Sequence, residues 1–334
     1  FGKYVMASMI TMFLQSAYSM IDGLFVSNLI GDTALSAVNV AWPVIAVVTA
    51  IGTGVGCGGA VIMSTKQGEG KNEESNIVRA NVILALLASS IVVTILFLVL
   101  LTPLLKLMGA EGELLRLSQI YGRVMLTGGV LQILSCGLTP LLRNDNRAVS
   151  AMMIMVGGLF VNLGLDFVFM YVFHMGIGGA AGASLCAQLF TTLCCLIILG
   201  TKKTDPIRFS QFIIRKEYWK KIFKTAVSPF GISLTPSLLI LYHNVACLKF
   251  GGDLAVNAYA LISSTVGSYR VLLIGVAEGI QPLASYAYGA HDFHAIRKIR
   301  NKAVITAIGV SFFLFIFTIA TARFYPAIYG YEGE

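Results

Sequence analysis

Two aspartates lie inside long apolar stretches of the sequence. Asp22 lies in SAYSMIDGLFVSNLIGD and Asp166 lies in NLGLDFVFMYVFHMGIGG. Asn162 and Asp166 are four residues apart and therefore share one helical face, and Ser184 falls at a similar expected depth. Two carboxylates with an amide and a hydroxyl can bind Na⁺ or share one proton. The alternative is that each aspartate only accepts structural hydrogen bonds between helices.

An ionisable side chain at membrane depth is costly unless it is paired, so these positions are functional candidates. We therefore predict a cation-coupling site, with Na⁺ as a candidate metal at its first three members: Asp22, Asn162, Asp166 and Ser184. Three further polar residues are candidates for substrate contact or gating: Glu278, Arg270 and His243. Arg270 precedes Glu278 by two helical turns, so the two either pair through intermediates or face a watery cavity. Glu278 is also placed to contact a cationic substrate, whereas a lone histidine at the position of His243 is more often a satisfied group at the membrane interface.

The elements that position these residues are expected to be transmembrane helices. Of 334 residues, 57% are hydrophobic and only 12% are charged, with a mean hydropathy of +0.81, whereas soluble domains carry about 25% charged residues. The uncharged runs predict an all-α, polytopic membrane protein with nine helices, at 4–28, 35–64, 77–101, 118–140, 149–172, 179–200, 219–247, 255–287 and 299–323. The chain does not begin with Met and shows no cleavable signal peptide, so we expect a partial chain.

Basic residues are distributed unevenly between the loops. If the N-terminus is cytoplasmic, 18 Lys and Arg fall on the inner side and five on the outer side. The positive-inside rule therefore predicts a cytoplasmic N-terminus in a bacterial-type plasma membrane. The net charge of +8 follows from these loops and does not require nucleic-acid binding. The basic linker favours the anionic surface of the membrane, and an ordinary positive-inside loop explains it at least as well. The six cysteines lie in apolar segments without metal-ligand spacing, which favours helix packing.

The sequence repeats itself after 221 residues without a gap, with 16 identities in 83 positions. Gly31-Asp32 falls on Gly252-Asp253, and Ser64 falls on Ser285. Six helices separate the copies, which predicts a parallel repeat of two six-helix bundles. The expected organisation is a first bundle at 1–200, a basic cytoplasmic linker at 201–218, and three helices of a second bundle at 219–334. An intact protein would then have twelve helices.

The stretch GTGVGCGG at residues 52–59 resembles a phosphate-binding loop only in composition. Such a loop follows a strand and keeps backbone N–H groups free, whereas this run lies within an uncharged helix. Two of its glycines recur in the second copy and form a small-xxx-small face in each half, at Gly54, Gly58, Gly275 and Gly279. We predict that these glycines allow close helix packing.

Three stretches in the right order resemble the multidrug and toxic compound extrusion (MATE) family, within the multidrug/oligosaccharidyl-lipid/polysaccharide flippase superfamily. They are IDGLFVSNLIGDTALSAVNVAWPV, NLGLDFVFMYVFHMGIGGAAGASLCAQ and GVAEGIQPLASYAYGAHD. The resemblance implies a V-shaped transporter of two six-helix bundles that exports cationic, amphipathic compounds in exchange for H⁺ or Na⁺. It also implies that Asp22, Asn162, Asp166 and Ser184 match the family's coupling residues. Ala7 stands where many members have proline, and Ala287 stands where the family usually has asparagine.

The leading hypothesis is therefore a secondary active efflux transporter, a monomer without cofactor whose partners are small cationic substrates and membrane lipids. A flippase for lipid or polysaccharide precursors is the first alternative, but it should line its cavity with several basic residues, and only Arg270 is expected inside the membrane. A channel or receptor is the alternative from another class. The chain contains no HExxH or GxSxG motif and no Cys/His pair at matching depth, so an enzyme is not expected.

Overall fold

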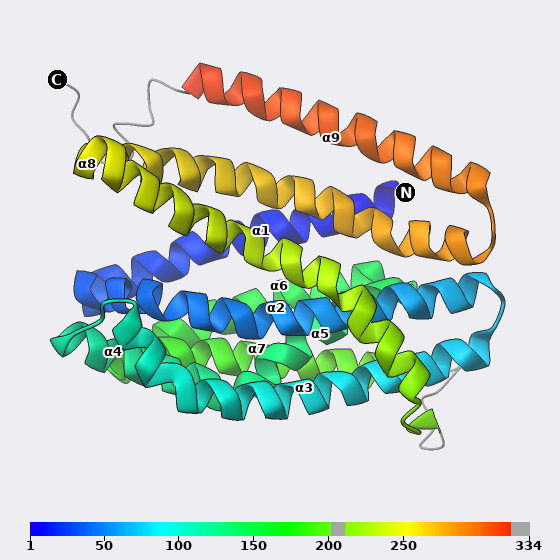
Figure 1. The fold of residues 1–334 in the computed structure, drawn as a ribbon, viewed down its shortest axis with the longest axis horizontal. Coiled ribbons are helices and arrows are strands. Elements are labelled where there is room, and N and C mark those ends of the chain that lie inside the picture. The colour runs from blue at the N-terminus through cyan, green and yellow to red at the C-terminus, as the bar shows by residue number, and fades with distance from the viewer. Residues whose placement is uncertain (202–210, 322–334) are drawn as a thin grey trace.

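The structure, a computed structural model, describes residues 1–201 and 211–321. These residues form helices and turns without a strand, which confirms the all-α fold. In chain order the elements are α1 (Gly2–Ile30), α2 (Asp32–Gly68), α3 (Asn72–Leu107), α4 (Gly112–Thr127), α5 (Gly129–Asn144), α6 (Ala148–Asp166), the π-helix η1 (Phe167–Val172), α7 (Gly176–Gly200), α8 (Lys216–Gly289) and α9 (Phe293–Thr321). The long elements run roughly side by side along one axis of the molecule (Figure 1).

Within the described part of the chain, five helical stretches are long and apolar enough to cross a membrane. They are Thr33–Gly68, Asn72–Leu107, Ala148–Val172, Gly176–Gly200 and Phe293–Ala320. The pair α4 and α5, bent by 58° between its two helices, is long and apolar enough for a sixth span if it is counted as one. The helix predicted at 118–140 is therefore wrong as a continuous rod. The bend falls at Gly128, where a Cβ would collide with the side chain of Leu185.

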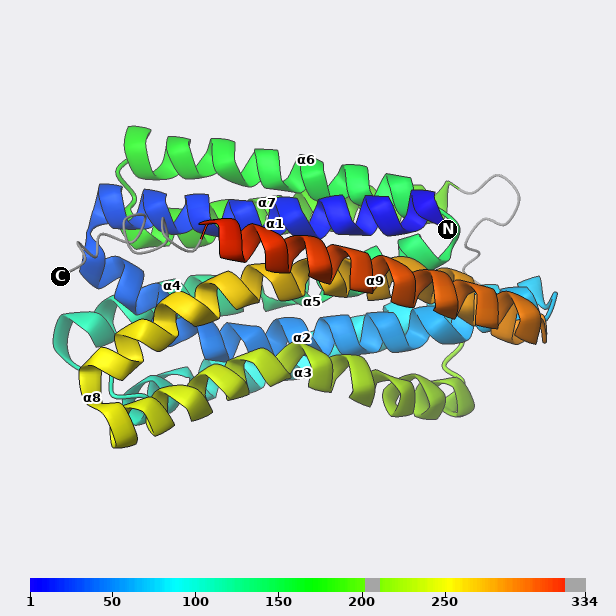
Figure 2. The ribbon, with the colours of Figure 1, turned by 90° about the horizontal axis from the view of Figure 1, so that it is seen from above.

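Two helices were predicted at 219–247 and 255–287, but α8 is a single helical element of 74 residues that reverses direction. A straight helix of that length would extend about 110 Å. Instead, Ile222 lies beside Gly58 and Tyr286 beside Gly68, so both ends of α8 meet the same end of α2. The ring of His243 stacks on that of Tyr259 with centroids 5.0 Å apart, which places the reversal between them. Figures 1 and 2 show these two arms, called here the first and second arm of α8.

The glycine run at 52–59 places α2 at the centre of the fold. Gly52 and Gly56 face the backbone of α5, Gly54 and Gly58 face the first arm of α8, and Gly59 faces a valine of α3. Because glycine has no Cβ, three neighbouring helices approach α2 closely at once. A continuous buried core surrounds this region and draws on α2, α3, α4, α5 and α7. The run lies inside a helix, which contradicts a phosphate-binding loop.

Contacts between the halves follow the repeat. A Cβ on Gly54 would lie 3.0 Å from Cβ of Phe230, on the first arm of α8. A Cβ on Gly275, on the second arm, would lie 2.9 Å from Cα of Met9 in α1. In the 221-residue repeat, Gly54 corresponds to Gly275 and Met9 corresponds to Phe230, so the two contacts are equivalent. The repeat found in the sequence therefore describes a reciprocal interface in space.

A third contact joins the end of α2 to the end of α8. The Ser64 hydroxyl donates to the Pro282 carbonyl over 3.1 Å, and Gly68 and Gly289 lie against backbone atoms of Tyr286 and Thr65 respectively. This set of contacts between α2 and the second arm of α8 is called here the closed end. By the predicted topology, it faces the cytoplasm.

Half of the predicted linker at 201–218, residues 202–210, lies outside the described residues. Its final part docks on α3 through the buried Asn81. The Asn81 amide nitrogen donates to the carbonyl of Ile213, and its oxygen accepts hydrogen bonds from the Arg215 backbone and the Trp219 indole, each over 3.1 Å. One buried amide thus ties the start of α8 to the first half of the chain.

Candidate cation-coupling site

The predicted carboxylates meet where α1 and α6 lie side by side. Asp166 is the last residue of α6 and is fully buried, and Asn162 is one turn before it. The Asn162 amide donates to Asp166 Oδ2 over 3.1 Å. Asp22 of α1 is hydrogen-bonded to Asp166 through their carboxyl groups. Three of the four predicted residues therefore form one contiguous cluster.

The chemistry of this pair follows from its atoms. Two ionised carboxylates have no hydrogen to share, so contact between them requires a proton or a metal cation between the oxygens. Oδ1 of Asp22 and Oδ1 of Asp166 are both buried without a hydrogen-bond partner among the described residues. Buried acceptors without donors are rare, and such oxygens are suited to a proton or Na⁺. Asn162 Oδ1 is a further oxygen at the same place.

Tyr121 is a member of the site that the sequence reasoning missed. Its side chain, on α4, is 5% exposed and interacts electrostatically with both Asp22 and Asp166. A signal for it was available in the sequence. Tyr121 is one turn into a helix expected to begin at the outer surface, which places it near the predicted depth of Asp22. The helix is anchored there because the Ser118 hydroxyl donates to the Ala37 carbonyl over 3.2 Å.

Ser184 lies half-buried on α7, and the structure gives no hydrogen bond from it to either carboxyl within the described residues. Immediately after Asp166 the α-helix changes into the π-helix η1. π-helical turns are rare, and they occur frequently at functional sites. The turn that follows η1 packs closely, since a Cβ on Gly179 would lie 3.2 Å from Cβ of Phe169. Helix α7 therefore begins directly against η1.

Glu278 pairs with Arg143 and not with Arg270, whose pairing through intermediates was one of the two alternatives considered. Arg143 Nη1 lies 2.5 Å from Glu278 Oε2 and 3.4 Å from the Ser8 hydroxyl oxygen. Arg143 is one of the 18 basic residues expected on the inner side, but it is buried in the last turn of α5. Arg270 lies half-buried on the second arm of α8. His243 donates from Nδ1 to the Leu239 carbonyl over 2.8 Å, which is the satisfied arrangement considered for it.

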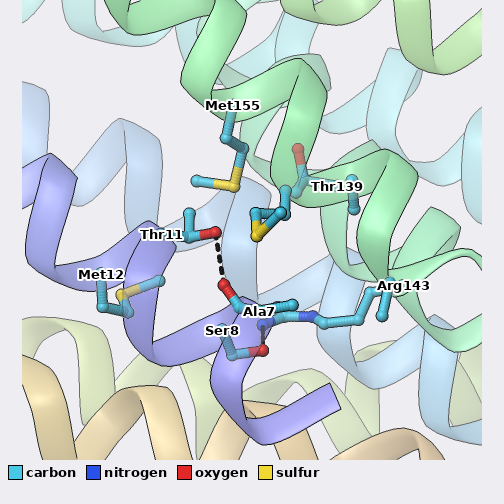
Figure 3. Close-up of a pocket in the computed structure, with 10 residues that line it drawn as sticks. Ala7, Ser8, Thr11, Met12, Thr139, Arg143 and Met155 are labelled. Atoms are coloured by element: carbon cyan, nitrogen blue, oxygen red, sulfur yellow. Dashed lines mark hydrogen bonds between the residues drawn. The ribbon is translucent and has the colours of Figure 1, made fainter. Parts of the chain in front are cut away.

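Two cavities adjoin this region. A small one, of about 10 Å³, lies between α1, α5 and α6, and it is lined by Ser8, Thr11, Arg143 and three methionines. Figure 3 shows the Arg143 side chain reaching from α5 toward Ser8, and the Thr11 hydroxyl donating to the Ala7 carbonyl over 2.8 Å. A larger cavity, of about 440 Å³, lies at the closed end beside Tyr4, Gln67 and Tyr286.

The chain resembles known transporters along nearly its whole length. The family model described as MatE matches residues 7–168 and 232–334. The multidrug export protein MepA of Staphylococcus aureus (strain N315) is 25% identical over 315 residues, which are 94% of this chain and 69% of MepA.

Solved structures give the same result. A crystal structure of MATE in complex with MaL6 has a TM-score of 0.92 at 25% identity, covering 98% of this chain and 73% of the other. A MOP-superfamily transporter from Pyrococcus furiosus Vc1, whose reversed binding-pocket polarity suggests a different function, has a TM-score of 0.92 at 25% identity, covering 99% and 75%. With the duplicated helical fold and the buried aspartate pair, these similarities show that the chain belongs to the MATE family of multidrug efflux transporters.

Proposed function

We propose that this protein is a secondary active transporter that exports cationic, amphipathic compounds in exchange for H⁺ or Na⁺. It works by alternating access of its two halves in a bacterial-type plasma membrane, with the N-terminus in the cytoplasm, and it is not an enzyme. The observation that carries the proposal is the buried, hydrogen-bonded contact of Asp22 with Asp166. The contact joins α1 to α6, so the charge of the pair influences how these two helices pack.

The coupling follows from the charge of this pair. With a proton or Na⁺ bound, the two carboxyls approach each other and α1 stays against α6. Without the ion, two negative charges repel, and the pair favours a different arrangement of α1. A ligand shifts such an equilibrium only by its differential affinity for the two states. The ion and the cationic substrate therefore favour opposite orientations, and the gradient of one drives export of the other.

The substrate class rests on the relatives and on the chain's own charges. MepA is a multidrug export protein. A flippase for phosphate-bearing precursors would need free basic groups in its cavity. The buried arginines Arg79 and Arg143 are instead paired with carboxylates, namely Asp145 at 3.6 Å and Glu278 at 2.5 Å. In this arrangement of the halves neither arginine is free to bind phosphate, which favours the export of cations over that of phosphate-bearing lipids.

The test is dye efflux from proteoliposomes with imposed H⁺ and Na⁺ gradients, applied separately. The wild type should respond to one of them, and Asp166→Asn and Asp22→Asn should each lose the response. Asp292→Asn is the matched control, because Asp292 is an exposed carboxylate whose Oδ1 accepts from the Ala295 backbone over 2.8 Å, which asparagine can also do. Undiminished gradient-driven efflux by the two site variants would refute the assignment.

A further inference from the structure

The ion pair of Arg143 with Glu278 joins the two halves of the chain. Glu278 belongs to the second arm of α8, whereas Arg143 and its second neighbour Ser8 belong to α5 and α1. The side chains are 9% and 21% exposed, and the shortest distance between them is 2.5 Å. The pair is therefore largely removed from solvent, and its geometry depends on how the halves are docked.

Close helix packing fixes that docking on both sides of Glu278. A Cβ on Gly275 would lie 2.9 Å from Cα of Met9, and one on Gly279 would lie 2.6 Å from Cα of Val5. Glu278 thus lies in the stretch of α8 that rests directly on the backbone of α1. Nearby, the closed end joins α2 to α8 through Ser64 and Pro282. Any movement that separates the halves at this end also separates Glu278 from Arg143.

Separation leaves the carboxylate of Glu278 without its cation. A buried charge that loses its partner is strongly unfavourable, so the open state requires another positive charge or water at this place. The polar neighbours that the structure gives for the pair include the Ser8 hydroxyl, the Cys57 thiol and the Thr139 hydroxyl, all of them neutral. None of them replaces a guanidinium. An organic cation does, because it brings both a positive charge and an apolar body.

The surroundings of Arg143 suit such a body. The small cavity beside it is lined by Met12, Met152 and Met155 from α1 and α6 (Figure 3). Methionine side chains adapt to ligands of different shape, and they are common on surfaces that bind many partners. Arg143 contacts Glu278 and lines the same cavity as these methionines, so its departure would connect an adaptable apolar wall to a carboxylate.

We propose that Glu278 binds the cationic group of the substrate when the closed end is open, and that Arg143 is the internal cation that replaces the substrate when this end closes. This inference rests on the proposed function for the substrate class, and it assigns a residue and a competitor to that class. Arg143 and the substrate compete for one carboxylate. Closing the end therefore expels the substrate from Glu278 without leaving the charge unpaired.

The test is equilibrium binding of rhodamine 6G, a fluorescent organic cation, to the purified full chain in nanodiscs without any gradient. Glu278→Gln should weaken binding at least tenfold, because the carboxylate is lost. Arg143→Gln should tighten binding about tenfold, because the internal competitor is lost. The opposite signs are diagnostic, since a purely structural pair predicts weaker binding for both. The matched control is the exposed pair Arg116 and Glu113, 2.6 Å apart on α4, whose glutamine variants should bind like the wild type.

Thermal unfolding of each variant identifies loss of folding, and the double variant Arg143→Gln/Glu278→Gln keeps the test valid if a single variant unfolds. The double variant removes both charges, so it should bind rhodamine 6G as weakly as Glu278→Gln. Nile red, a neutral dye, is the control probe and should bind equally well to all folded variants. Unchanged rhodamine binding in Glu278→Gln, or weakened binding in a folded Arg143→Gln, would overturn the inference. Gradient-driven efflux of the wild type is measured separately. If the binding predictions fail, the proposed transport function still stands, and if no gradient drives efflux, the binding result can still be interpreted.

Discussion

Gly58 of α2 and Gly279 of α8 are equivalent in the repeat, and each lies against the backbone of a helix from the other half. A Cβ on Gly58 would lie 2.7 Å from the Ala226 nitrogen, and a Cβ on Gly279 would lie 2.6 Å from Cα of Val5. Ala226 and Val5 are themselves equivalent in the repeat. The two halves therefore meet through two equivalent contacts related by the repeat. Each contact is possible because glycine has no side chain.

Gly58→Leu and Gly279→Leu should each destabilise the protein by about 3 kcal/mol or more, because the side chain meets backbone that cannot rotate away. The measurement is thermal unfolding of the purified protein in detergent. Gly309→Leu on α9 is the control, since a Cβ there meets no atom within 4 Å. Equal stability of the Gly58 and Gly309 variants would contradict the packing role.

Asn81→Ala should destabilise the docking of the α8 start on α3. The substitution leaves the Arg215 amide and the Trp219 indole without their acceptor, at a cost of about 2–4 kcal/mol if both stay buried. Trp219 also provides the readout, because its fluorescence should shift to longer wavelength as the indole contacts water. Asn301→Ala, at an exposed amide, is the comparison and should remain within about 0.5 kcal/mol of the wild type. An unshifted fluorescence spectrum in a stable Asn81→Ala variant would contradict the role of Asn81 in docking the start of α8 on α3.

Tyr121→Phe removes only a hydroxyl from the neighbourhood of Asp22 and Asp166. We expect that hydroxyl to stabilise the pair while it carries no ion, which is the form that exchanges substrate, because Tyr121 interacts electrostatically with both carboxyl groups. Its loss should slow gradient-driven efflux about two- to tenfold, the range expected for one hydrogen bond. Tyr171→Phe, on the exposed face of η1, tests the same change away from the site. The role assigned to Tyr121 fails if both variants transport at the wild-type rate.

The fold could be predicted largely from apolar run length, because a membrane span requires an apolar helix whatever it packs against. The bend at Gly128 could not. It lies inside an uncharged run, and the side chain packed against it, Leu185, is far away in the sequence. The reversal of α8 was expected near 247–255, but not within one helical element. Local pattern predicts spans well, whereas bends depend on tertiary neighbours.

Part of the candidate site could likewise be predicted from the sequence, and part of it could not. Asp22, Asn162 and Asp166 were predictable because a carboxylate in an apolar run stands out, and because four-residue spacing fixes a common face. The partner of Glu278 was not predictable, since Arg143 is 135 residues away and near the end of its helix, where a basic residue ordinarily faces solvent. Only the docking of the two halves shows that this arginine is buried. The prediction of Ser184 as a coupling residue stays a prediction.

The most direct test of cation exchange measures ion release during substrate binding, with no membrane and no gradient. Rhodamine 6G is added to the purified protein in weak buffer, and released H⁺ is followed with a pH indicator and released Na⁺ with a radioactive tracer. The wild type should release one of the two ions as the dye binds. Asp166→Asn should bind the dye without releasing either. Dye binding by the wild type with no release of H⁺ or Na⁺, or equal release by Asp166→Asn, would contradict exchange at the Asp22–Asp166 pair.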